Sequence, residues 1–283
     1  MEPYRTTRSL VAMISRVLSA RGRRLTGLYS IEGTRLAERA IRAGAPLEAV
    51  LAAESLAHSD ESRYRDLMDA LTATGCRIAI ARDELLIQLT KGRDLGLILG
   101  LVRMPPPLTL SEFLSRDYAT GETPKPLSHK PSMPLLLAAA DIVDPGNVGA
   151  LTRTAHAVGA NALLAAGASD PFHPRATRIS RGSIFKLPVI VYDTVASLIN
   201  DLKMNDILLA GTAVSGGTSL PNVPWPRQGT AILMGNEAEG LPSDVEAALD
   251  YKITIPMAEG VDSYSVNAAA AIVLYAAAQS RNE

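Results

Sequence analysis

Three segments in the second half of the chain share one pattern, in which a short apolar strand runs directly into a polar loop that contains glycine. They cover residues 135–160, 232–241 and 253–267. In the first, the apolar run 135–140 leads into the turn Asp144-Pro-Gly-Asn-Val-Gly149 and then into a helical pattern. Parallel α/β sheets present the carboxyl ends of their strands at one edge, where ligands bind. The pattern therefore predicts one site built from several strand ends.

Composition constrains the protein less than this pattern does. With 283 residues the chain can form one large or two ordinary domains, and at 47% hydrophobic but only 4% aromatic residues its core is expected to be aliphatic. The formal net charge is −1, yet residues 1–42 hold nine Arg and three Glu, a local charge of +6. Such a patch can hold phosphates, although taken alone it is better explained as a solvated helix face.

The sequence predicts a cytoplasmic protein without a membrane span. Cys76 is the only cysteine, so no intramolecular disulfide is possible, which fits a reducing compartment. No segment reaches the ~18 apolar residues of a membrane helix. The Arg-rich, acid-poor N-terminus also suits an organellar presequence, which is the less favoured alternative.

Hydrophobic periodicity predicts two α/β domains, residues 1–104 and 133–283, joined by a Pro-rich linker at 105–132 with a short helix at 110–115. In the first domain, a small three-layer arrangement, helices are expected at 7–22, 35–43 and 62–72, with Thr34 as a cap, and strands at 28–31, 47–52, 77–80 and 96–102. In the second, strands are expected at 135–140, 162–165, 189–192, 207–210, 231–234 and 251–255, and helices at 147–159, 175–180, 194–202, 243–248 and 266–280.

Common catalytic motifs are absent from the sequence. There is no G-x-G-x-x-G and no phosphate loop, and the four histidines lack metal-ligand spacing, so no metal is expected. Asp141 and Asp144 are a carboxylate pair that would suit a nucleotide- or metal-dependent hydrolase, a remote alternative. In its Asp-Pro-Gly context, Asp144 is better explained as a turn former.

The turn at 144–149 and the helix after it offer an amide, Asn147, and a guanidinium, Arg153. Gly149 lies four residues before Arg153, one helical turn away, and leaves room beside it. The planar fork of Arg suits phosphate. From this turn alone, a capping Asn and a surface Arg remain the simpler explanation.

Taken together, the three loops resemble the motifs of the SpoU (TrmH) family of RNA ribose 2′-O-methyltransferases, within the SPOUT superfamily. The first motif is 144–149 with Arg153, the second is 234–242, and the third runs from Ile255 through 261–263 into the Ala-rich helix. Segments 180–188 and 24–36 are also similar to parts of the family, so the resemblance covers nearly the whole chain except the linker.

This resemblance implies an α/β fold class, with a C-terminal methyltransferase domain that contains a trefoil knot and a smaller N-terminal α/β domain that binds the RNA. It implies S-adenosylmethionine as the methyl donor, a homodimer through the C-terminal domain, and structured RNA as the substrate, ribosomal rather than transfer RNA.

The resemblance also assigns residues to roles. The implied catalytic residues are Asn147, Arg153 and Glu237. The implied cofactor-binding residues are Gly235, Asn236, Ile255, Met257, Tyr264, Ser265 and Asn267. The implied RNA-binding residues are Arg21, Arg23, Arg24, Glu32 and Arg35.

The family is often described as using the Arg of its first motif as the base, but an Arg with a pKa above ~12 is a reluctant base. We expect Arg153 instead to bind the adjacent phosphate and to stabilise the developing alkoxide. A phosphate oxygen or a water would then be the base, and Asn147 would orient Arg153 or the ribose.

The third motif departs from the family pattern. It usually reads Ser-Leu-Asn-Val-Ser, and here it is Ser263-Tyr-Ser-Val-Asn267. Asn and Ser have in effect exchanged places, so hydrogen bonding is expected with altered geometry, while Tyr264 either stacks on adenine or crowds it. This departure keeps open a different class of function, a non-catalytic RNA-binding or ribosome assembly factor that retains the fold.

Overall fold

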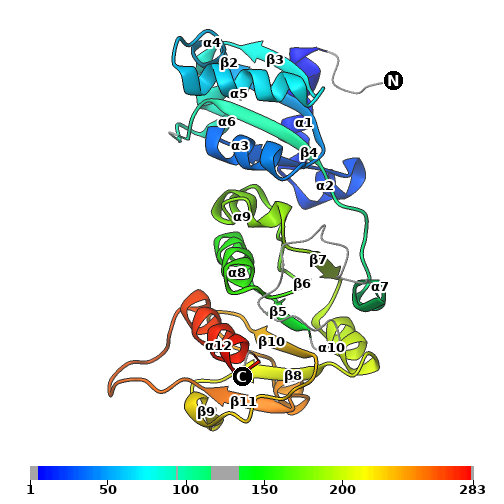
Figure 1. Cartoon of the computed structure of the whole chain (residues 1–283), viewed down its shortest axis with the longest axis vertical. Coiled ribbons are helices and arrows are strands. Elements are labelled where there is room, and N and C mark those ends of the chain that lie inside the picture. The colour runs from blue at the N-terminus through cyan, green and yellow to red at the C-terminus, as the bar shows by residue number, and fades with distance from the viewer. Residues whose placement is uncertain (1–5, 94, 116–133, 282–283) are drawn as a thin grey trace. The chain divides into compact units, whose positions relative to one another are not determined.

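The computed structural model describes residues 6–93, 95–115 and 134–281. The chain folds into two compact units, labelled by element in Figure 1. Unit 1 comprises Met1–Pro106 and Phe172–Phe185, and unit 2 comprises Pro107–Pro171 and Lys186–Glu283. Both units mix helices with a β-sheet, which confirms the expected α/β class.

Unit 1 has a mixed four-stranded sheet in the order β1-β4-β2-β3, in which only β2 and β3 are parallel. Its strands are β1 (Leu28–Glu32), β2 (Leu47–Ala53), β3 (Arg77–Ala81) and β4 (Ile98–Arg103). Its helices are α1 (Thr7–Val17), α2 (Ala20–Thr26), α3 (Thr34–Arg42), α4 (Glu54–Ala57), α5 (Ser62–Ala73), α6 (Asp83–Thr90) and α9 (Pro174–Ile179), with a 3₁₀ turn at Ser183–Phe185. α1 contacts all four strands.

The helix expected at 7–22 is two helices, because the chain turns at residues 18–19. Ser19 caps α2 by accepting a hydrogen bond from the amide of Gly22. The turn is so tight that a Cβ on Gly22 would lie 1.8 Å from the carbonyl oxygen of Arg16. Arg23 Nη1 closes the C-terminal end of α1 by donating to the carbonyls of Val17 (2.8 Å) and Leu18 (3.0 Å).

The start of α3 also differs from the expectation. Gly33, with φ of 94°, is the residue before the helix, and Thr34 is its first residue rather than its cap. Thr34 is buried, and its amide donates to the carbonyl of Leu95. A backbone with φ near 94° is open to glycine at little cost, so Gly33 sets the turn from β1 into α3.

Segment 172–185 lies between the first two loop motifs in sequence but packs in unit 1. α9 contacts β1, Thr177 Oγ1 donates to the carbonyl of Ser30 at 3.3 Å, and the ring centroids of Phe172 and Tyr29 are 5.2 Å apart. Sequence reasoning placed this segment in a C-terminal domain of residues 133–283. Its contacts group it with unit 1 instead.

Glu32 anchors this segment. Its carboxylate is only 7% exposed and pairs with Arg93 (Nε to Oε1 2.7 Å) and with Arg178 of α9 (Nη1 to Oε2 3.0 Å). An almost buried carboxylate is stable only when it is paired and hydrogen-bonded. Glu32 was expected on an RNA-binding surface, but both of its oxygens are used inside the protein.

We expect Glu32→Gln to lower the free energy of unfolding by about 2 kcal/mol, because two guanidinium groups lose their shared counter-charge. Chemical denaturation followed by circular dichroism measures the change. Glu84→Gln, on the exposed side of α6, is the control and should unfold as the wild type does. Equal midpoints for the two variants would show that the ion pairs do not hold α9 on β1.

Unit 2 is built on a parallel seven-stranded sheet in the order β7-β6-β5-β10-β8-β11-β9. Its strands are β5 (Leu135–Ala140), β6 (Ala162–Ala166), β7 (Val189–Tyr192), β8 (Leu208–Thr212), β9 (Thr218–Ser219), β10 (Thr230–Met234) and β11 (Tyr251–Thr254). Its helices are α7 (Leu110–Ser115), α8 (Pro145–Val158), α10 (Val195–Met204), α11 (Ser243–Ala247) and α12 (Val266–Ser280), with a 3₁₀ turn at Leu220–Asn222.

Part of the expected linker belongs to this unit. α7 forms at 110–115 as expected, but Leu110 and Phe113 are buried in the same hydrophobic core as β5 and α10. These two apolar residues, one helical turn apart, fix the segment to unit 2. Residues 116–132 of the expected linker lie outside the described residues.

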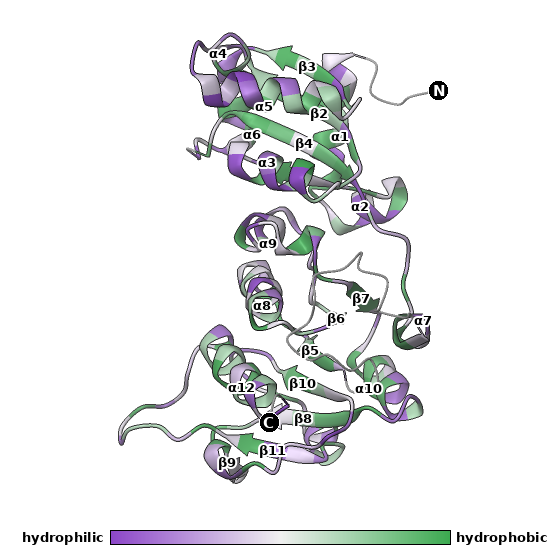
Figure 2. Cartoon of the chain, viewed as in Figure 1, coloured by the Kyte–Doolittle hydropathy of each residue, from purple (hydrophilic) through white to green (hydrophobic). Residues whose placement is uncertain are grey.

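The order of the central strands positions the site. β5, β10, β8 and β11 are neighbours and parallel, so the loops that follow them leave from one edge of the sheet. β5 and β10 are buried along their whole length and β8 at its three central residues, and Figure 2 shows the hydrophobic character of β8 and β10. Strand order changes direction between β5 and β10, where open α/β sheets bind ligands.

Candidate active site

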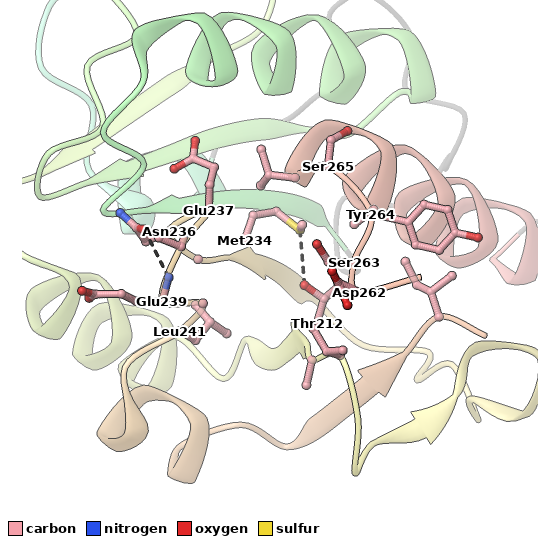
Figure 3. A pocket seen from close by; sticks show the side chains of 18 of the residues that line it. Thr212, Met234, Asn236, Glu237, Glu239, Leu241, Asp262, Ser263, Tyr264 and Ser265 are labelled. Atoms are coloured by element: carbon pink, nitrogen blue, oxygen red, sulfur yellow. Dashed lines mark hydrogen bonds between the residues drawn. The ribbon is translucent and has the colours of Figure 1, made fainter. Parts of the chain in front are cut away.

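A pocket of about 690 Å³ opens at this edge of the sheet. It is lined by the loops that follow β8 (residues 213–215), β10 (235–241) and β11 (255–266), together with Asn147 at the start of α8. Figure 3 shows Met234, Thr212 and Tyr264 together with the polar side chains that line the pocket. The expectation that several strand ends build one site is therefore met by the loops after β10 and β11.

The loop after β10 is a tight turn held by one asparagine. Asn236 Oδ1 accepts hydrogen bonds from the amides of Ala238 (2.9 Å) and Glu239 (3.4 Å), and its carbonyl accepts from Gly240 at 2.8 Å. Gly235 is required by this closure, because a Cβ there would lie 2.3 Å from the carbonyl carbon and oxygen of Gly240. The glycine therefore allows the loop to fold onto itself at the pocket wall.

Asn147 and Glu237 meet at the rim of the pocket. Asp144 caps α8 by accepting from the amide of Gly146 at 2.7 Å, which starts the helix and sets the position of Asn147. The Nδ2 group of Asn147 donates to Glu237 Oε1. A carboxylate only accepts, so the amide nitrogen must face Glu237, and Asn147 Oδ1 is left as an acceptor.

The loop between β11 and α12 supplies the opposite wall. Ile255, Met257, Tyr264 and Ser265 all line the pocket, and Ser265 also caps α12 by accepting from the amide of Ala268. Asn267 does not line it. Its Oδ1 accepts a 2.7 Å hydrogen bond from Thr154 Oγ1 and ties α12 to α8, so the exchange of Asn and Ser puts the serine at the pocket and the asparagine in a helix contact.

Comparison with known proteins decides the family. The SpoU rRNA Methylase family matches residues 134–275. The chain belongs to this family. One relative, the 23S rRNA (uridine(2479)-2′-O)-methyltransferase of Streptomyces viridochromogenes, is 34% identical over 143 residues, which are 48% of this chain and 50% of the relative. The match thus spans about half the length of that relative.

A second relative is the 23S rRNA (guanosine(2553)-2′-O)-methyltransferase RlmP of Bacillus subtilis (strain 168), 31% identical over 175 residues, 59% of this chain and 70% of the relative. Among solved structures, the SpoU methyltransferase AviRb from Streptomyces viridochromogenes, in complex with AdoMet, superposes with a TM-score of 0.79. It is 24% identical and covers 98% of both chains, so it supports the fold of the whole SpoU chain.

Arg153 of this SpoU chain lies two turns beyond the start of α8, is exposed, and does not line the pocket. Within the described residues it makes no hydrogen bond or ion pair. A positively charged fork on an exposed part of α8, with no partner among the described residues, is suited to meet a phosphate.

His156 follows Arg153 on the same helix and is half-buried. Burial and the nearby positive charge of Lys186 lower its pKa below the usual value for histidine. The ring is therefore neutral at pH 7. It offers no charge to the site.

Sequence reasoning missed the loop after β8. Thr212 and residues 213–215 line the pocket, and Thr212 Oγ1 lies 4.0 Å from Met234 Sδ. The signal was present, since strand 208–212 also runs into a Gly-containing loop at 215–217. Leu241 and Asp262 were missed as well, although both lie inside the second and third motifs.

Asp141 and Asp144, the carboxylate pair of the hydrolase alternative, both accept hydrogen bonds from backbone amides. Asp141 Oδ1 accepts from the amide of Ala168 at 3.0 Å, and Asp144 caps α8. Among the residues that the structure describes, no group of three or more His, Cys, Asp or Glu side chains is placed to hold a metal ion. No helix in the described ranges is both long and apolar enough to cross a bilayer.

The residues expected to bind RNA divide into two groups. Arg21, Arg24 and Arg35 are exposed on α2 and α3. Arg23 is only 2% exposed and holds the end of α1, and Glu32 is buried between two arginines. These two side chains stabilise unit 1 and are not available to a ligand in this conformation.

Proposed function

We propose that this protein transfers the methyl group of S-adenosylmethionine to a ribose 2′-hydroxyl of structured RNA, and that the RNA is ribosomal. The observation that carries the proposal is the pocket at the carboxyl ends of β8, β10 and β11, walled by the second and third SpoU motifs. Both relatives described above are named as 2′-O-methyltransferases of 23S rRNA.

The residues of the pocket suit the methyl donor. Its volume of about 690 Å³ lies in the range of small-molecule sites. Met234, Leu241 and Ile255 offer an apolar wall for adenine, and Glu239 and Asp262 supply negative charge for a cation. When bound, S-adenosylmethionine supplies an electrophilic methyl group on a positively charged sulfur. The AviRb structure, of the same fold, holds AdoMet by its description.

The Asn147–Glu237 pair is proposed to orient the ribose. A 2′-hydroxyl is a poor nucleophile at neutral pH, so its proton must leave as the new C–O bond forms. Glu237 fixes the Asn147 amide so that Oδ1 remains an acceptor at the pocket rim, where it can take a hydrogen bond from the hydroxyl. An RNA phosphate oxygen or a water is proposed to take the proton.

Arg153 is proposed to bind the phosphate next to the target ribose and to stabilise the developing alkoxide. The other proposed cofactor contacts are Gly235, Asn236, Ile255, Met257, Tyr264 and Ser265, all of which line the pocket. An open pocket at the motif loops favours this enzyme over a non-catalytic assembly factor, which would have no need of one.

We further propose a trefoil knot in unit 2, a cytoplasmic location and a homodimer. α12 supports the dimer, because it has no charged residue and carries half-buried Ile272 and exposed Tyr275 beside its buried face. A helix that is apolar all round is normally buried on all sides. A second copy of the chain would cover this face.

The dimer predicts a sedimentation mass near twice the 30.0 kDa of one chain. Tyr275 is 60% exposed, so Tyr275→Glu should shift the equilibrium to the monomer by placing a charge in the covered face. Met204→Glu, at an 84% exposed site on α10, is the matched control and should leave the mass unchanged. A monomeric wild type at micromolar concentration would contradict the dimer.

The function is tested by incubating the protein with labelled S-adenosylmethionine and total bacterial RNA. The proposal predicts label in the ribosomal fraction. Label confined to transfer RNA would overturn the choice of RNA. No label, with the donor bound and RNA retained, would favour the assembly factor instead.

A further inference from the structure

Packing of α9 on β1 gathers arginine side chains that no part of the proposed reaction uses. They lie on α3 and on the segment 174–181, which are distant in sequence and are linked in unit 1 by a hydrogen bond from Arg39 to Arg181. We call this surface the α3–α9 arginine cluster. It consists of Arg35, Arg39, Arg178 and Arg181.

Two contacts hold the cluster together. Arg39 Nη1 donates to the carbonyl of Arg181, and the aliphatic stem of Arg39 covers Gly182, where a Cβ would lie 2.9 Å from its Cδ. Arg178 is held by Glu32. Arg35 lies one helical turn from Arg39 on α3, so their side chains are neighbours.

The local charge is strongly positive. Glu32 is the buried counter-charge, but it is shared between Arg93 and Arg178. Glu38, the only carboxylate on α3, pairs with Arg63 of α5 at 3.0 Å. Figure 2 shows α3 as largely hydrophilic. Arg35 and Arg181 are exposed, and within the described residues neither side chain has a hydrogen-bond or ion-pair partner.

The backbone at Arg181 indicates that its side chain is there for a ligand. Its φ of 53° is left-handed, which costs a residue other than Gly about 1 kcal/mol and suits Asn better than Arg. The side chain is exposed and makes no hydrogen bond or ion pair within the described residues that would offset that cost. Positions that keep an unfavourable conformation of this kind cluster at functional sites.

We propose that the α3–α9 arginine cluster binds the phosphodiester backbone of the RNA substrate. This inference rests on the proposed function for the identity of the polyanion and adds where unit 1 holds it. The segment between the first two SpoU motifs thereby becomes part of the RNA-binding surface of unit 1. Guanidinium forks give bidentate hydrogen bonds to phosphate and fix position rather than sequence.

The test compares the wild type with the double variant Arg35→Gln/Arg181→Asn. Asn relieves the backbone at 181, so the variant should melt no lower than the wild type, which separates binding from folding. Arg82→Gln, which removes one positive charge elsewhere in unit 1, is the control for non-specific loss of charge. Arg82 is exposed after β3, at the opposite edge of the sheet from β1 and α9.

The measurement is the affinity for deproteinised 23S ribosomal RNA as a function of salt. Each lost phosphate contact should flatten the slope of log affinity against log salt by about 1, so the double variant should lose about 2 in slope and about 10- to 100-fold in affinity. S-adenosylmethionine binding should not change. Equal slopes for the double variant and Arg82→Gln would overturn the proposal.

Two further readouts complete the design. Vesicles with anionic phospholipid should show no difference between wild type and double variant, and a loss of vesicle binding alone would assign the cluster to a membrane surface and overturn the proposal. Methyl transfer is scored separately. If the wild type binds RNA through the cluster but transfers no methyl group, the proposed methyltransferase function is wrong and RNA binding by the cluster stands. If it transfers methyl groups but the double variant has the salt slope of the wild type, the function stands and RNA binding by the cluster is wrong.

Discussion

Arg153→Ala should reduce methyl transfer by about 100- to 1000-fold, the usual effect of removing a group that stabilises charge in the transition state. Arg153 does not line the pocket, so the dissociation constant for S-adenosylmethionine should stay within about twofold of the wild type. The loss should therefore lie in turnover and in RNA binding. Single-turnover rates at saturating donor, with calorimetry of donor binding, measure the two separately.

Arg153→Lys separates the effect of charge from that of the planar guanidinium, and Arg227→Ala is the control. Lys keeps the charge but lacks the planar fork, so it should recover only part of the rate. Arg227 is exposed just before β10, at the end of the strand opposite the pocket, and its loss should leave the rate unchanged. Near-normal turnover by Arg153→Lys would show that bidentate phosphate binding is the wrong role.

Gly235→Ala should abolish binding of S-adenosylmethionine because the added methyl group distorts the pocket wall, although no group that contacts the donor is removed. The added Cβ would lie 2.3 Å from the carbonyl group of Gly240 and 2.5 Å from the amide nitrogen of Leu241, which are backbone atoms that cannot turn away. The 235–241 loop must then open. We expect the affinity for S-adenosylmethionine to fall at least about 100-fold, or about 2.8 kcal/mol, by calorimetry.

Gly240→Ala is the control within the same loop. Gly240 has φ of 74° but open space where a Cβ would sit, so an alanine costs about 1 kcal/mol of backbone strain and no clash. Its effect on affinity should stay below about tenfold. If the two variants bound equally well, the close approach at Gly235 would not be what shapes the pocket.

Six of the seven strands of unit 2 could be predicted because they are short apolar runs ended by Gly, Pro or polar residues, whereas the two-residue strand β9 (Thr218–Ser219) is polar and was missed. β5 and α12 begin and end where the pattern of apolar residues places them. α7 was also predicted, but its role was not. Prolines on both sides suggested a linker, whereas Leu110 and Phe113 decide by burial that the helix packs on unit 2.

Contacts between segments distant in sequence could not be predicted. Segment 172–185 reads as part of the C-terminal domain, and only the packing of Phe172 on Tyr29 and of Arg178 on Glu32 places it in unit 1. The same limit applies to Arg23, which in sequence is one of several arginines and in the structure closes a helix end.

In the pocket, too, the residues of the sequence motifs could be predicted, whereas contacts between distant segments could not. Motif resemblance led to Gly235, Ile255 and Tyr264, because their loops follow recognisable strands. The meeting of Asn147 and Glu237, ninety positions apart, depends on β5 and β10 being neighbours in the sheet. The departure at 263–267 was visible in the sequence, but only the helix packing shows that Asn267 bonds Thr154.

The most direct test is the position of the transferred methyl group on the RNA. A methyl on the 2′-oxygen prevents its attack on the adjacent phosphate, so alkaline hydrolysis of the labelled RNA leaves that position as a resistant dinucleotide. The proposed function predicts that label from S-adenosylmethionine appears in the dinucleotide fraction of ribosomal RNA and disappears with Arg153→Ala. Label recovered in mononucleotides would contradict it, because the acceptor would then be a base rather than a ribose.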